Sequence, residues 1–86
     1  MNIKIEQIKP NLTRVNIGNV YVWFSYETPV AFKAAKFPII VRENNVWGPT
    51  TGKHLNAIDG GTKAAKAERV SSDEFNRALD ELELED

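Results

Sequence analysis

The sequence predicts an α+β domain: an antiparallel meander of four or five strands packed by a C-terminal amphipathic helix. Three observations support this class. Residues 20–26 are β-branched and aromatic, a Gly18-Asn19 pair precedes them between apolar segments, and apolar residues after position 71 follow helical spacing. With 86 residues, the chain suffices for one core. We expect a single domain with the meander at 1–44, a loop and short helix at 48–60, and the final helix at 71–84.

Turn chemistry predicts the strand register. A two-residue turn at Gly18-Asn19 places Ile17 opposite Val20, Val15 opposite Val22 and Thr13 opposite Phe24, and on the other face Asn16 opposite Tyr21 and Arg14 opposite Trp23. A three-residue turn at 9–11 places Ile3 and Ile5 opposite Ile17 and Val15, whereas a slip of one residue would bury Lys4 and Glu6 without partners. We expect one buried flank under the C-terminal helix, formed by Ile3, Ile5, Val15, Ile17, Val20 and Val22.

The remaining elements follow from local signals. Residues 30–32 and 38–43 read as two further strands joined by a turn at 33–36. Thr50 or Thr51 is expected to cap a short helix at 51–59 that ends at Gly60-Gly61. Residues 62–69 have no apolar stripe, so we expect a loop or a frayed turn.

The last helix carries the clearest signals. Ser71 and Glu74 match the S-x-x-E capping box, and Val70 stands where a hydrophobic staple onto Phe75 is expected. The face that packs on the sheet is then formed by Phe75, Ala78, Leu79 and Leu82.

Composition excludes several classes of protein. The chain has no cysteine, so disulfides and thiolate zinc sites are impossible, and a cytoplasmic location is expected. No apolar run approaches the roughly 20 residues of a membrane span, and the N-terminus lacks the apolar segment of a signal peptide.

Charge is segregated along the chain. Residues 31–69 carry seven basic and three acidic side chains, whereas residues 70–86 carry one and seven. This pattern fits a solvated acidic helix end matched to a basic middle, or a basic face for nucleic acid. The residues of such a basic face would be Lys33, Lys36, Arg42, Lys53, His54, Lys63 and Lys66.

The segment Trp47–Asn56 gathers polar groups between a predicted strand and a predicted helix. It does not match a phosphate-binding P-loop, because three residues separate Gly48 from Gly52 and His54 replaces the required hydroxyl. The start of this helix can still hold a phosphate or carboxylate through Thr50, Thr51, Lys53 and His54, with Trp47 and Asn56 beside it. The alternative is structural: the threonines cap the helix, Trp47 and Leu55 fill the core, and His54 is a surface or capping residue.

The outer face of the sheet offers a second candidate site. Arg14, Tyr21 and Trp23 share that face, where bases can stack on aromatic rings, where a protein partner can dock, or where the side chains only stabilise the sheet. His54 is the sole histidine and has no adjacent carboxylate or nucleophile in the sequence, so we expect no catalytic residue, no metal and no cofactor.

Residues 24–32, residues 41–44, and Trp47 with Thr50-Thr51-Gly52-Lys53-His54-Leu55-Asn56 resemble a family of short uncharacterised proteins encoded by tailed bacteriophages, including phages of marine cyanobacteria. The resemblance covers about residues 12–58, and this chain departs from it at Asn45 and at Gly48-Pro49. It implies a small phage protein made in the cytoplasm of the infected cell, and it transfers no activity to any residue.

These observations favour a non-enzymatic phage accessory protein that binds a host or phage protein. A homodimer through an exposed sheet edge or through the aromatic face is a further expectation. The alternative is nucleic-acid or phosphate binding by the basic region 33–66 and the helix start at 50–54.

Overall fold

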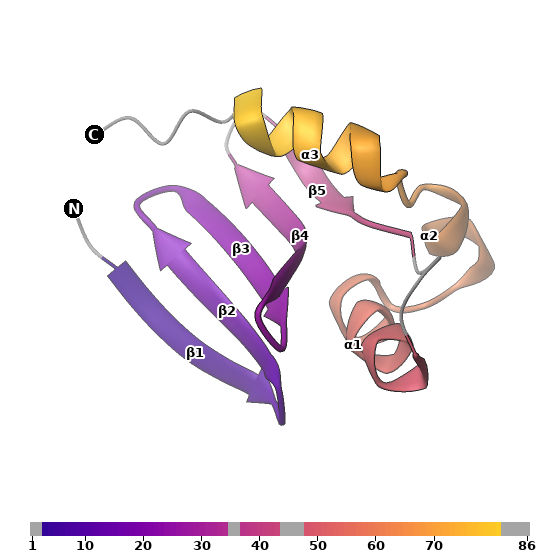
Figure 1. The fold of residues 1–86 in the computed structure, drawn as a ribbon, viewed down its shortest axis with the longest axis horizontal. Coiled ribbons are helices and arrows are strands. Elements are labelled where there is room, and N and C mark those ends of the chain that lie inside the picture. The colour runs from indigo at the N-terminus through magenta and orange to yellow at the C-terminus, as the bar shows by residue number, and fades with distance from the viewer. Residues whose placement is uncertain (1–2, 35–36, 44–47, 82–86) are drawn as a thin grey trace.

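The computed structural model describes residues 3–34, 37–43 and 48–81. Five strands form one antiparallel sheet in chain order (Figure 1): β1 Ile3–Lys9, β2 Leu12–Ile17, β3 Val20–Ser25, β4 Thr28–Ala34 and β5 Phe37–Val41. Three helices follow: α1 Pro49–Asp59, α2 Lys63–Ala67 and α3 Ser72–Glu81. The predicted α+β class, with a meander and a C-terminal helix on the sheet, is confirmed. Trp47, Lys36 and the predicted helical residues 82–84 lie outside the described residues.

The strand registers agree with the predicted ones. Ile17 pairs with Val20 and Val15 with Val22 across the β2–β3 hairpin, while Ile3 and Ile5 pair with Ile17 and Val15. The β1–β2 turn differs, because Lys9 pairs with Leu12 and a bulge lies between Gln7 and Lys9. The loop is therefore two residues plus a bulge. The bulge takes up the extra residue, so the pairing further along the strands is unchanged.

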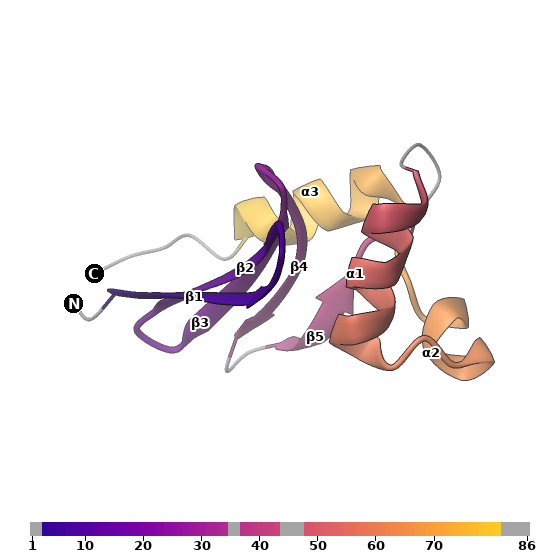
Figure 2. The same ribbon diagram turned by 90° about the horizontal axis from the view of Figure 1, so that it is seen from below.

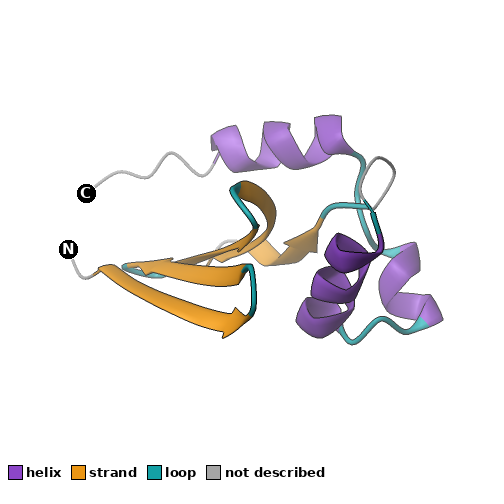
Figure 3. Cartoon of the chain, turned by 60° about the horizontal axis from the view of Figure 1, so that its bottom comes forward, coloured by secondary structure: helices purple, strands orange, loops and turns teal. Residues whose placement is uncertain are grey.

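Helix α3 lies over part of one face of the sheet (Figure 3). Phe75 is fully buried and meets Phe32 edge to face, with 5.4 Å between ring centroids. The backbone N–H of Glu74 donates to Ser71 Oγ at 3.2 Å, which is one of the two hydrogen bonds of the predicted capping box. The other hydrophobic residues packed in this cluster are Val20, Val22, Phe24, Ile40, Val70, Ala78 and Leu79.

The buried flank is shorter than predicted. Ile3 and Ile5 are 60% and 71% exposed, so their assignment to the core was wrong. The reason is where α3 begins: Val70, just before it, is held beyond β5 by backbone hydrogen bonds with Val41 and Glu43. The ten described residues of α3 are about 15 Å long. Even at right angles to the strands, these residues would not span the roughly 19 Å between the outer strands of a five-stranded sheet.

Helix α1 covers one end of the opposite face, beside β5 (Figure 2). Leu55 is fully buried there against Val30, Ala31 and Val41, with Trp23 and Ile58 at the margin. The predicted threonine cap was wrong: Gly48 is the N-cap, no side chain caps the helix, and Pro49 stands in its first turn. Proline suits this position because its missing N–H would have no partner in the helix. The predicted C-terminal stop is confirmed, since Gly60 is left-handed with φ 89°.

Residues 62–69, predicted as a loop or a frayed turn, contain the short helix α2. Thr62 caps it, because its hydroxyl oxygen accepts from the Ala65 N–H at 3.1 Å. The segment lacks an apolar stripe, as the sequence indicated, and none of its helical residues is buried.

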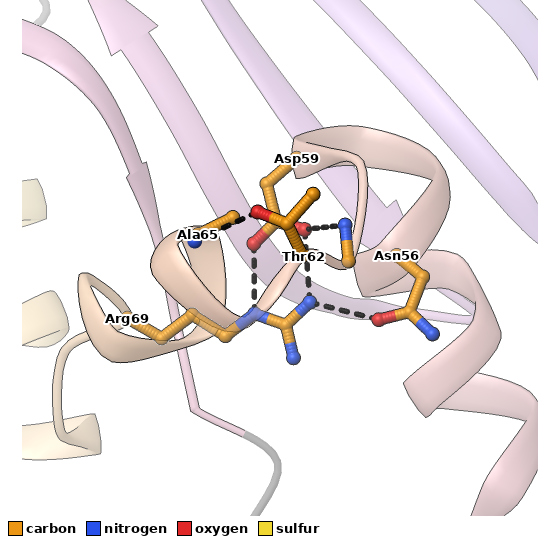
Figure 4. Close-up of polar contacts among 6 residues, drawn as sticks. Asn56, Asp59, Thr62, Ala65 and Arg69 are labelled. Carbon is orange, nitrogen blue, oxygen red and sulfur yellow. Dashed lines mark hydrogen bonds and ion pairs between the residues drawn. The ribbon is translucent and has the colours of Figure 1, made fainter.

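A buried ion pair fastens the end of α1 to the segment after α2 (Figure 4). Arg69 Nε and Nη2 donate to the two carboxylate oxygens of Asp59 at 2.8 and 2.9 Å, and Nη2 also donates to Asn56. The Gly61 N–H donates to the same carboxylate. Gly61 is left-handed, and a Cβ at this position would lie 2.7 Å from the Asn56 side chain. We call these four residues, Asn56, Asp59, Gly61 and Arg69, the Arg69 clamp.

The substitution Arg69→Ala is expected to lower the free energy of unfolding by about 3 kcal/mol, because it leaves a buried carboxylate without its counter-charge. The side chains of Arg69 and Asp59 are only 7% and 8% exposed, so solvent screens the pair weakly. Urea denaturation followed by circular dichroism measures the change. Lys66→Ala, on exposed α2, is the control; an equal loss in both variants would contradict the assignment.

The clamp also predicts a dependence of stability on pH. Burial raises the pKa of the Asp59 carboxyl, but the hydrogen bonds from Arg69 and Gly61 and the charge of Arg69 outweigh it and hold the pKa below its ordinary value. The contribution of Asp59 is therefore complete above about pH 3.9, the pKa of an unfolded aspartate, and is lost as the pH falls through the lower folded value.

Asp59→Asn tests this dependence. The difference in unfolding free energy between the wild type and this variant should be constant near neutral pH and should shrink as the pH falls into the acidic range. Chemical denaturation over a pH series measures it. A difference that grows with acidity would show that the folded pKa is not depressed.

Candidate functional site

The start of α1 is fastened by a buried polar network. Ser25 Oγ lies 3.0 Å from Thr51 Oγ1 and 2.7 Å from His54 Nδ1, and His54 Nε2 lies 3.1 Å from the carbonyl oxygen of Pro10. Because a carbonyl only accepts, Nε2 carries a proton. In the neutral ring Nδ1 then accepts from Ser25, whose oxygen accepts from Thr51. The network joins the β1–β2 turn, the end of β3 and α1.

This network overturns the expected position of His54. The side chain was predicted at the surface or at a helix cap, but His54 is 3% exposed and Thr51 is also buried. Thr50 and Lys53 remain exposed. Asn56 binds Arg69, and Trp47 lies outside the described residues. The structure therefore does not bring the predicted residues 50–54 together around an open anion site, since the Thr51 hydroxyl and the His54 imidazole point into the fold.

Sequence reasoning missed Ser25, which forms the pairing expected of a nucleophile and a base. The two residues are 29 positions apart, so no local motif links them. Within the described part of the chain no carboxylate contacts the imidazole; the Pro10 carbonyl holds its other nitrogen. Ser25 is 3% exposed, and Tyr26 lies beside the histidine ring with 6.0 Å between centroids. The arrangement joins three chain segments, and the Ser25 hydroxyl is buried within it.

Among residues 3–34, 37–43 and 48–81, no group of three or more histidine, aspartate and glutamate side chains is placed to hold a metal ion.

Helix α1 packs on one end of its face of the sheet. The rest of that face contains a shallow groove of about 620 Å³. We call it the aromatic groove, and its lining comes from β2, β3, β4 and β5: Arg14, Tyr21, Trp23, Lys33 and Ile39. A smaller hollow of about 260 Å³ shares Tyr21 and Lys33 and extends to Gly18-Asn19 at the β2–β3 turn.

The rings and the guanidinium of the groove are held in place by one another. Tyr21 and Trp23 lie with 6.3 Å between ring centroids, and Arg14 Cζ stands 5.2 Å above the Tyr21 ring. Arg14 Nη2 also contacts Glu6 Oε1 at 2.9 Å, so much of its charge is balanced within the sheet. Lys33 is exposed at the rim. The groove thus combines an apolar floor with one exposed lysine.

Sequence reasoning placed part of this groove correctly. Arg14, Tyr21 and Trp23 share a face because alternation along β2 and β3 puts them there, as the register predicted. Ile39 was not identified, and Lys33 was considered only as part of a basic face. Their positions depend on the irregular pairing of β3 with β4 and on the pairing of β5, for which the predicted turn at 33–36 gave no register; Lys33 and Ala34 belong to β4 instead of that turn.

The buried network predicts different outcomes at two neighbouring threonines. Thr51→Val keeps the side-chain shape but removes the hydroxyl that bonds Ser25, so it should lower the free energy of unfolding by about 1 kcal/mol. Thr50→Val makes the same change on an exposed side chain and should alter it by less than about 0.5 kcal/mol. Urea denaturation of both variants checks the contrast, and a larger effect at Thr50 would refute the inward assignment.

Comparison with known proteins places the chain in a family without placing its function. None of the helices within the described ranges has the length and apolar character needed to span a membrane. No curated protein and no solved structure matches the chain. A family model does match, over residues 3–77. The chain therefore belongs to the family of unknown function DUF8033.

Proposed function

We propose that this protein is a small non-enzymatic phage accessory protein that binds a host or phage protein through the aromatic groove. The resemblance of residues 24–32 and of the Thr50–Asn56 segment to proteins of tailed bacteriophages supports the phage origin. It also supports a site of action in the cytoplasm of the infected cell. The composition of the groove carries the binding proposal.

The groove has the residue types that anchor protein interfaces. Tryptophan, tyrosine and arginine are enriched at binding hot spots because they present large rigid surfaces with a polar handle. Mutual contacts among Arg14, Tyr21 and Trp23 hold these side chains in place before a partner arrives, which reduces the entropy lost on binding. With Ile39 and Lys33 at its margin, the groove fits an extended segment that carries an apolar side chain and a carboxylate.

Nucleic-acid binding is the weaker proposal. Glu6 balances Arg14, and Arg42 is bonded to the Pro29 carbonyl and to Ser72 between the sheet and α3. The exposed lysines Lys53, Lys63 and Lys66 belong to α1 and α2 and do not line the groove. A net charge of −1 supplies little general attraction for phosphates.

The proposed function predicts that Lys33→Glu reduces partner capture. Host lysate is passed over immobilised wild-type protein and over the variant, and the bound proteins are quantified by mass spectrometry. The charge reversal should repel the acidic partner, and retention should fall about tenfold, equivalent to about 1.4 kcal/mol. Lys53→Glu is the matched control, because it reverses an exposed lysine on α1 and should retain the partner as the wild type does.

Two results would count against the proposal. One is a folded wild-type bait that retains no specific protein, or a Lys33→Glu variant that retains the partner unchanged. The other is binding of single-stranded or duplex DNA at low salt, with an affinity that falls steeply with ionic strength; this result would favour the nucleic-acid alternative.

A further inference from the structure

Strand β1 leaves one edge of the sheet open. All seven of its residues are exposed, including Ile3 and Ile5, and among the residues that the structure describes β2 is its only neighbour in the sheet. The opposite edge is different, because Val70 forms backbone hydrogen bonds beside the end of β5. An open edge presents unpaired backbone N–H and C=O groups, which pair readily with another strand.

The ladder determines which backbone groups face outward. A two-residue turn closes the β2–β3 hairpin at Ile17 and Val20, and such a closing pair is hydrogen-bonded. Alternation then directs the backbone of Arg14 and Asn16 toward β1, where they pair with Glu6 and Lys4. The backbone groups of the alternate residues Ile3, Ile5 and Gln7 therefore point to the open edge.

Charge selects the register in which this edge can pair with itself. Consider two antiparallel copies related by a two-fold axis perpendicular to the sheet. Paired residues then point to the same face only if the axis passes between one residue and its own equivalent in the second copy. A pair centred on Lys4 brings two lysines together, and one centred on Glu6 brings two glutamates together. A pair centred on Ile5 places Lys4 of each copy opposite Glu6 of the other, whereas pairs centred on Ile3 or Gln7 bring no opposite charges together.

We propose that a second copy of this chain pairs with the β1 edge, antiparallel and centred on Ile5, to give a continuous ten-stranded sheet. The three outward-facing residues then pair as Ile5 with Ile5 and Ile3 with Gln7. The Lys4–Glu6 pairs fall at non-hydrogen-bonded positions, where side chains lie closest. The Glu6 side chain is 45% exposed and Arg14 contacts its Oε1, which leaves its outer side open to the lysine of the second copy.

This inference goes beyond the aromatic groove and stands independently of it. The groove is lined from β2 to β5, whereas the dimer uses β1. Lys33→Glu should therefore leave the dimer unchanged, so failure of either proposal leaves the other intact.

Cysteine cross-linking tests the register, because the chain has no cysteine of its own. Ile5→Cys places one cysteine in each copy opposite its equivalent. The two Cα atoms would lie about 5.5 Å apart, within the range for a disulfide. Ile3→Cys is the matched control, since its thiols would be separated by about four residues, or roughly 14 Å along the strands. Under mild copper–phenanthroline oxidation, Ile5→Cys should form a covalent dimer and Ile3→Cys should remain largely monomeric.

Charge variants test the pairing without cross-linking. Lys4→Glu alone and Glu6→Lys alone each place like charges opposite one another, so sedimentation should show a mass near 9.7 kDa for each variant. An equimolar mixture restores both opposite-charge pairs and should give a heterodimer of twice that mass. Misfolding of either variant would not produce such recovery.

Three outcomes would overturn the proposal. The wild type stays monomeric at the highest soluble concentration, Ile3→Cys cross-links as readily as Ile5→Cys, or the mixture of charge variants remains monomeric.

Discussion

Side-chain alternation along five antiparallel strands is the constraint on which every surface of this protein depends. Alternate residues of a strand point to opposite faces of the sheet. Val22 and Phe32 therefore lie under α3, whereas Trp23 and Ala31 point toward α1. Neither helix covers its whole face. The aromatic groove lies on the part of one face that α1 leaves uncovered, and the exposed isoleucines of β1 lie on the part of the other face that α3 leaves uncovered. Both surfaces therefore follow from the arrangement of the helices.

The attachment of α1 depends on polar contacts as well as on its apolar side. Leu55 enters the core, and two residues of the same helix, Thr51 and His54, bond to Ser25 and to the Pro10 carbonyl. Hydrogen bonds between buried groups are directional, so they specify an orientation that apolar packing alone leaves less defined. At the other end of α1, the Arg69 clamp specifies how the chain leaves the helix. The helix is thus held near both of its ends.

The two open surfaces differ in the kind of recognition they offer. The groove presents preformed aromatic side chains and one exposed lysine, which suits a partner of different chemistry. The β1 edge presents backbone groups and a charge pattern that is complementary to itself about Ile5. Natural sheets often place charges on edge strands to discourage pairing. In β1 the same charges discourage the registers centred on Lys4 and Glu6 and leave one register favoured.

The sequence by itself determined the features that depend on neighbours within a few residues. Gly18-Asn19 specified the hairpin and hence which residues of β2 and β3 share a face, and Ser71 with Glu74 specified where α3 begins. Only the tertiary structure decided that His54 is buried and that Ile5 is exposed. The first depends on Ser25 and Pro10, which are 29 and 44 positions away, and the second depends on how far α3 reaches after Val70 is bound beside β5. Such contacts arise from the packing of whole elements, which local patterns in a chain do not encode.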